Sequence, residues 1–101
     1  MELNSIKTID VTAKEWFDKV NGNSYFSAQV TLNYGMEDEV TYKLPFQYGY
    51  EEQYRYAALD KVKQVANMSY MMTWYDIKDI GIICRFNKVN AKKSEVKAFG
   101  I

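Results

Sequence analysis

Apolar and polar residues alternate with a period of two through the first third of the chain. The alternation fills residues 6–20 and 23–34, on either side of Asn21-Gly22. Asn and Gly tolerate the positive φ angles of a tight type I′ turn, so this dipeptide between two alternating runs predicts a β-hairpin. Pairing outward from the turn sets Phe17 opposite Phe26 and gathers the apolar residues of both strands on one face.

A helix is the alternative for residues 12–20. Thr12 and Glu15 have the spacing of a capping box, and the apolar residues that follow recur at helical intervals before Gly22. A helix here would deprive the strand over residues 24–34 of the cross-strand partners that a hairpin supplies. We therefore favour the hairpin.

After a turn the alternation resumes, and then it gives way to a helical period. Residues 39–48 predict a third strand, and Pro45 places it at an edge of the sheet because proline donates no ladder hydrogen bond. Apolar residues spaced three and four apart then predict a helix over about 50–66. A short helix over about 73–80 and a fourth strand over about 82–89 follow.

These elements predict an α+β fold, in which a three-stranded antiparallel meander is packed by the helix over residues 50–66. We expect a single domain over residues 1–101, because the chain has the length of one domain and no linker-like segment. The place of the fourth strand in the sheet stays open. The tail from Asn90 fits either a last helical turn or a returning strand.

The composition removes much catalytic chemistry. The chain has no histidine, so sites that pair histidine with serine or cysteine, and histidine-rich metal sites, cannot form. We expect no enzyme activity, no catalytic residue, no cofactor and no metal. The lone Cys84 cannot make an internal disulfide, and no apolar run is long enough to span a membrane. We therefore expect a cytoplasmic protein that has no membrane contact.

What remains is surface recognition. The aromatic rings of Trp16 and Tyr25 are predicted on the outer, polar face of the hairpin, and exposed aromatic rings can anchor a protein partner. With the neighbouring Lys14 and Lys43 they form the candidate partner-binding set. The alternative is structural: the two rings stabilise the hairpin as a cross-strand pair, or the C-terminal segment covers them.

Nucleic-acid binding, through the same sheet face or through the basic C-terminal segment, is the second candidate function. Self-association through that face or through an unpaired edge strand is a third. Thirteen basic and thirteen acidic side chains cancel, so no overall positive field attracts a polyanion. The basic residues nevertheless concentrate near the C-terminus, where they could contact phosphates. This alternative nucleic-acid-binding set is Arg85, Lys88, Lys92, Lys93 and Lys97.

Two stretches of the chain, WFDKVNGNSYF over residues 16–26 and PFQYGY over residues 45–50, resemble small accessory proteins encoded by tailed bacteriophages and prophages. The resemblance covers about the first two thirds of the chain and identifies no active site. It implies a phage protein acting in the cytoplasm of a bacterial host. Small phage proteins of this kind act by binding a host or phage protein, and inhibition of host defence is one expected consequence.

Overall fold

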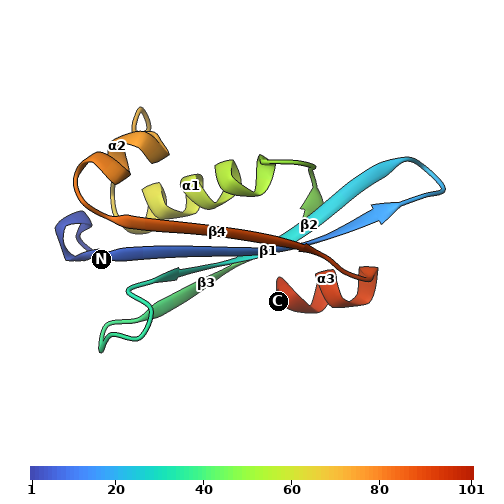
Figure 1. The fold of residues 1–101 in the computed structure, drawn as a ribbon, viewed down its shortest axis with the longest axis horizontal. Coiled ribbons are helices and arrows are strands. Elements are labelled where there is room, and N and C mark those ends of the chain that lie inside the picture. The colour runs from blue at the N-terminus through green and yellow to red at the C-terminus, as the bar shows by residue number, and fades with distance from the viewer.

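The structure, a computed structural model, describes residues 1–101. A four-stranded sheet carries two helices on one face and one helix on the other (Figure 1). In chain order the elements are a 3₁₀ helix at Leu3–Ser5, β1 at Thr8–Asp18, β2 at Asn23–Leu32, β3 at Val40–Tyr48, α1 at Gln53–Val65, α2 at Trp74–Asp79, β4 at Ile83–Asn90 and α3 at Lys93–Phe99. The expected α+β fold, with a meander, a helix, a short helix and a fourth strand, is confirmed.

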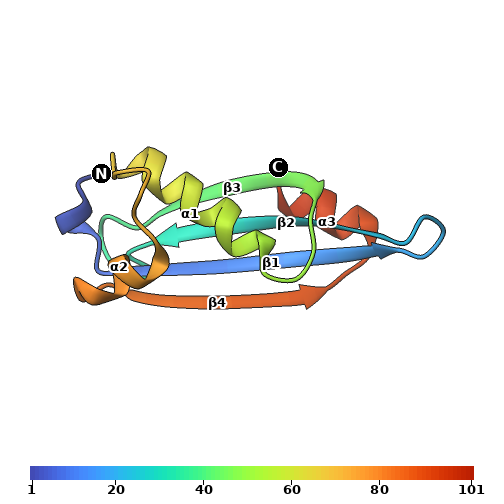
Figure 2. The ribbon, with the colours of Figure 1, turned by 90° about the horizontal axis from the view of Figure 1, so that it is seen from above.

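The strands lie in the order β3-β2-β1-β4, as Figure 2 shows from above. β1, β2 and β3 form the antiparallel meander, and β3 is an edge strand, as Pro45 predicts. After β3 the chain crosses the sheet through α1 and α2, and β4 then pairs parallel to β1 at the opposite edge. This places the last strand, whose position the sequence left open.

The hairpin is present over residues 8–32, but its register differs from the prediction by two residues. Asp18 pairs with Asn23, so the loop has four residues instead of the two-residue Asn21-Gly22 turn. The cause is the Asp18 side chain, because its carboxylate accepts hydrogen bonds from the backbone N–H groups of Val20, at 3.0 Å, and Asn21, at 3.3 Å. A shift of two leaves every side chain on its predicted face.

The register shift changes which residues stand opposite each other near the loop. Phe17 lies opposite Ser24, not opposite Phe26, and Trp16 lies directly opposite Tyr25. Residues 12–18 are strand and not helix, so the alternative helix over residues 12–20 is wrong.

The inner face of the sheet, which we define as the face covered by α1 and α2, holds the hydrophobic core. Each hairpin strand sends every second side chain into this core, as the alternation predicts. α1 buries one stripe of residues against it, and α2 adds Ile77. The buried inner-face residues of the hairpin are Ile9, Val11, Ala13, Phe26, Ala28, Val30 and Leu32.

Capping interactions set the limits of the short helices. Thr73 caps α2, since its hydroxyl accepts from the Asp76 backbone N–H and the Asp76 carboxylate accepts from the Thr73 N–H.

The tail forms α3, which resolves the choice between a helix and a returning strand. α3 lies on the outer face, opposite α1 and α2 (Figure 1). None of the helices is long and apolar enough to cross a membrane.

Candidate functional site

Aromatic rings gather on the outer face at the loop end of the hairpin. Trp16 and Tyr25 are stacked with ring centroids 5.8 Å apart, and Tyr25 stacks on Phe46 at 5.2 Å with nearly parallel planes. Tyr48 meets the edge of the Tyr25 ring at 5.8 Å. Such pairs add about 0.5–1.5 kcal/mol beyond the area they bury. Residues 16–26 and 45–50, which are distant in the sequence, therefore meet in this cluster.

Phe46 reaches this cluster because β3 contains a bulge. Leu44 pairs with Ala28, and Gln47 pairs with Phe26. Two residues of β3, Pro45 and Phe46, therefore stand opposite one residue of β2, Ser27. In a strand that alternates without interruption, Phe46 would lie on the same face as Leu44. The extra residue turns Phe46 to the outer face instead.

α3 covers part of this cluster. The buried Val96 packs from α3 onto the outer face, and the Ser27 hydroxyl donates to the Val96 carbonyl. Gln29 Nε2 donates to the Phe99 carbonyl at 3.1 Å. At Gly100 the backbone comes so close to β3 that an added Cβ would lie 2.7 Å from the Leu44 carbonyl oxygen. The C-terminal segment thus docks on the outer face by close packing and by polar contacts.

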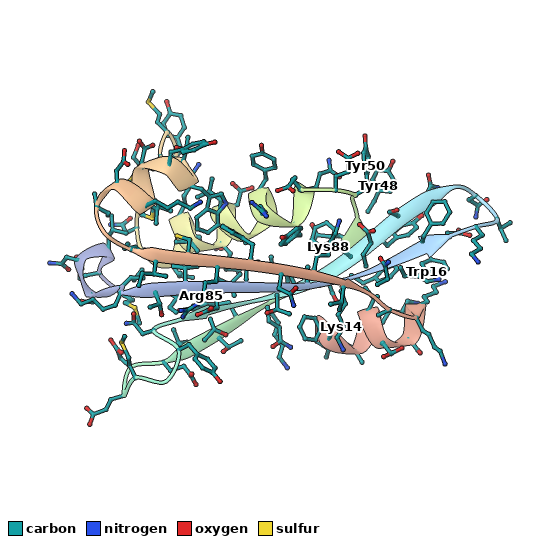
Figure 3. The ribbon with its side chains drawn as sticks, viewed as in Figure 1. Lys14, Trp16, Tyr48, Tyr50, Arg85 and Lys88 are labelled. Carbon is teal, nitrogen blue, oxygen red and sulfur yellow. The ribbon has the colours of Figure 1, made fainter.

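The predicted partner-binding set lies together beneath and beside α3. Trp16, Tyr25 and Lys14 are half-buried, and Lys43 is exposed. Lys14 Nζ sits 4.8 Å from the centre of the Phe99 ring, while Lys43 Nζ donates to the carbonyl of Ile101 at 2.7 Å. Figure 3 shows Lys14 and Trp16 beside α3. The chain's own C-terminal segment therefore occupies part of the surface that these four residues form.

An open groove remains beside Trp16, between the end of β1 and the segment that leads into α3. We call it the hairpin groove; its volume is about 620 Å³. Phe17 in this groove is 52% exposed, and Lys93 Nζ lies 5.0 Å from the centre of the Trp16 ring. The residues that line it include two carboxylates, three lysines and two aromatic residues: Glu15, Glu95, Lys19, Lys92, Lys93, Trp16 and Phe17.

The basic set near the C-terminus divides between the two faces of the sheet. Arg85 forms an ion pair with Asp10 on the outer face, and the hydrogen bond to Asp10 raises the pKa of the Arg85 guanidinium. Lys88 projects toward the helices, where it pairs with Glu15 at 3.1 Å and donates to the Glu51 carbonyl. Figure 3 shows Arg85 and Lys88 well separated along β4.

The other three basic residues of the set lie on or next to α3. Lys92 and Lys93 line the hairpin groove, and Lys97 Nζ stands 5.5 Å from the centre of the Phe46 ring. The structure therefore brings two members of the basic set to Trp16, while Lys88 contacts the groove only through its ion pair with Glu15 and Arg85 pairs with Asp10 on the outer face. Sequence reasoning kept the aromatic and basic sets apart, because the contact between residues 16 and 93 is long-range and has no local signal.

A second hollow lies between α1, α2 and β4, and sequence reasoning missed it. We call it the helix hollow; its volume is about 340 Å³. The residues that shape it come from three separate elements, so only the crossover from β3 to β4 brings them together. They include Arg55, Tyr56, Trp74, Tyr75, Lys78 and Phe86.

The remaining reactive side chains do not converge. No three side chains among histidine, cysteine, aspartate and glutamate are grouped so that they could hold a metal ion. The Cys84 thiol is half-buried on the inner face of β4, and this burial raises the pKa of the thiol. A raised pKa disfavours the reactive thiolate.

Comparison with known proteins adds no further constraint on the site. No protein-family model, curated protein or solved structure matches the chain.

Proposed function

We propose that this chain is a non-enzymatic binding protein that holds an acidic segment of a protein partner in the hairpin groove. The observation that carries the proposal is the presence of two aromatic residues at the end of β1, Trp16 and Phe17, whose side chains point to opposite faces of the strand, together with three lysines along the same groove. Neither feature alone would single out this surface.

The aromatic residues supply the anchor. Phe17 is about half exposed at the end of the hairpin, and Trp16 keeps part of its surface open at the groove. Val20, in the loop that follows β1, is 91% exposed. Aromatic residues are enriched among the few side chains that dominate protein interfaces, because burying them removes a large area from water.

The charges of the groove favour an acidic partner. Its two carboxylates have contacts within the chain: Glu15 pairs with Lys88, and Glu95 Oε1 accepts from the Lys92 backbone N–H at 3.3 Å. The lysines Lys19, Lys92 and Lys93 belong to none of the three ion pairs of the structure. Glu95 keeps its negative charge, and the Asp18 carboxylate lies near enough to Lys93 for their charges to interact, so the three lysines leave the groove with a small net positive charge. Complementary charge gives orientation and a faster encounter.

The same distribution argues against nucleic acid as the partner. Arg85 and Lys88 are paired with carboxylates on opposite faces of the sheet, so of the predicted basic set only the lysines on or next to α3 are left to contact a phosphate backbone. The resemblance to phage accessory proteins supports a host or phage protein as the partner, acting in the bacterial cytoplasm. Inhibition of host defence would follow if the bound segment belongs to a defence protein.

Affinity capture from phage-infected cells, followed by direct binding of the purified partner, tests the proposal. We expect the double variant Lys92→Glu with Lys93→Glu to weaken the purified complex at least about ten-fold, since two favourable charge contacts become repulsive. Phe17→Ser should weaken it as well. The control pair Lys7→Glu with Lys61→Glu carries the same charge change outside the groove and should leave the affinity unchanged.

Two results would overturn the proposal. One is a purified partner whose affinity is equal for the wild-type chain and the groove variants, with circular dichroism showing all of them folded. The other is binding to mixed oligonucleotides with an affinity that falls steeply as salt is raised, which is the signature of phosphate contacts and would establish the nucleic-acid alternative.

A further inference from the structure

We infer that the helix hollow is a binding site for a small planar aromatic anion, that is, a flat ring system carrying a carboxylate or a phosphate. The hollow lies on the helical side of the sheet and shares no lining residue with the hairpin groove. This inference is therefore independent of the proposed partner site.

The aromatic walls of the hollow are held in place by contacts within the chain. The Trp74 ring meets the Phe86 ring edge to face, with centroids 4.9 Å apart and planes at 83°. Trp74 Nε1 donates to the carbonyl of Arg55 at 2.9 Å, which fixes the orientation of the indole. A wall that is already ordered loses little entropy when a flat ring packs against it.

Two cations border these walls. The Arg55 guanidinium carbon lies 4.4 Å from the centre of the Phe86 ring, and Lys78 Nζ lies 5.7 Å from it. Lys78 is exposed and belongs to no ion pair. Both cations thus stand at the rim of an aromatic cavity, where an anionic group on a bound ring would meet them.

The donors of Arg55 are only partly used inside the chain. Its Nε donates to Tyr54 Oη at 3.2 Å and lies 2.7 Å from Glu52 Oε2, while its two Nη groups make no hydrogen bond. These planar Nη donors match the geometry of a carboxylate or a phosphate. The negative charge of Glu52 compensates the positive charge of Arg55, so Lys78 supplies the net positive charge of the hollow.

The size of the hollow limits the ligand. Small-molecule sites enclose about 300–1,000 Å³, and this one, at about 340 Å³, lies at the small end. One fused ring system with a single anionic group fits such a volume. Aromatic carboxylates and nucleoside monophosphates share this chemistry, and the experiment includes one of each.

The test follows the indole N–H resonance of Trp74 by NMR. The chain has two tryptophans, so a Trp16→Phe background leaves Trp74 as the single indole. The probes are 2-naphthoate and adenosine 5′-monophosphate, each paired with a neutral match, 2-naphthamide and adenosine. We expect at least one anionic probe to shift the Trp74 resonance and to bind about ten-fold more tightly than its neutral match, as a hydrogen bond to a charged group predicts.

A charge variant separates this site from non-specific ring stacking. Lys78→Gln should weaken the binding of the anionic probe about ten-fold and leave the affinity for its neutral match unchanged. Lys7→Gln, on the first segment of the chain, should alter neither. The inference is overturned if neither anion moves the indole resonance at millimolar concentration, if each anion and its neutral match bind equally, or if Lys78→Gln has no effect.

Discussion

The two faces of one sheet are covered in different ways. On the inner face, α1 and α2 bury a continuous hydrophobic surface that includes Val30 and Leu32. On the outer face, the seven-residue α3 buries one valine and is otherwise held by hydrogen bonds and lysine–aromatic contacts. Apolar area is the larger source of stability, so the inner face should stabilise the fold while the outer face can vary in how tightly it is covered.

The uncovered half of the outer face explains why one short helix is enough. Away from the aromatic cluster this face is mostly polar: Thr31 and Thr41 are joined by their hydroxyls and Asp10 is paired with Arg85, while Ile83 of β4 is an exposed apolar residue there. Polar side chains that satisfy one another can remain in water without a cover. α3 therefore lies over the half of the face that holds the rings.

The largest effect is expected from an inner-face cavity. Leu32→Ala removes a fully buried side chain from the core and should lower the free energy of unfolding by about 3 kcal/mol. Denaturant unfolding followed by circular dichroism measures this loss. Thr31→Ala, the adjacent residue on the outer face, is the matched control and should cost about 0.5 kcal/mol or less. Equal losses at the two positions would remove the distinction between the faces.

A smaller effect is expected where α3 docks. Gly100→Ala places a methyl group within 3.0 Å of backbone atoms of both Leu44 and Pro45, so the end of α3 must move outward. We expect a loss of about 2 kcal/mol from overpacking. In a Trp74→Phe background, Trp16 should also become more exposed and its fluorescence should shift to the red. Ser94→Ala, exposed on the same helix, should change neither quantity.

If Gly100→Ala left both the stability and the Trp16 emission unchanged, α3 would not be the cover that the structure shows. If the variant also bound the protein partner more tightly, α3 would be competing with that partner for the aromatic cluster. The same protein sample can answer both questions.

The inner face could be predicted from the sequence because its signal is local. Alternation in residues 9–13 and 28–32 defines which side chains enter the core, and an error of two residues in the register leaves this set unchanged. The loop itself was predicted wrongly, since the Asn-Gly signal was outweighed by the hydrogen bonds that the Asp18 carboxylate makes with the loop backbone.

The candidate site could be predicted only in part. Trp16, Tyr25, Lys14 and Lys43 were identified on one face by alternation, but nothing near them in the sequence indicates that residues 93–101 fold onto them. Phe46 joined the cluster through a bulge, which breaks the period on which the prediction relied. Long-range contacts and a single inserted residue are the two features that a pattern of local periods does not contain.

The polar anchor of α3 should have a moderate effect. Ser27→Ala removes the hydroxyl that donates to the buried Val96 carbonyl, and the expected loss is about 1 kcal/mol. Hydrogen exchange should become faster at the amides of α3 and remain unchanged in α1, because only the outer cover is loosened. An equal increase in both helices would mean that the two faces unfold as one unit.

The smallest effect is expected in the loop that joins the two hairpin strands, and it should depend on pH. Hydrogen bonds from Asn21, first from its side chain and then from its backbone, lower the pKa of the Asp18 carboxyl below the ordinary value of 3.8. A carboxyl whose folded-state pKa is lowered stabilises the fold above its unfolded-state pKa, and this contribution is lost as the pH falls through the folded-state value. The wild-type chain should therefore lose stability below pH 3.8 in part through Asp18.

Asp18→Asn isolates this contribution because asparagine keeps the shape of the side chain but does not titrate. The variant should be slightly less stable than the wild type at neutral pH, and the difference should shrink in acid as the wild-type carboxylate is protonated. Thermal melts across the acidic range measure the difference. An Asn21→Ala background lacks the side-chain hydrogen bond that lowers the pKa of Asp18 most. In that background, Asp18→Asn should change the stability by a smaller amount. A difference that is constant with pH would show that the loop is set by backbone geometry and not by the carboxylate.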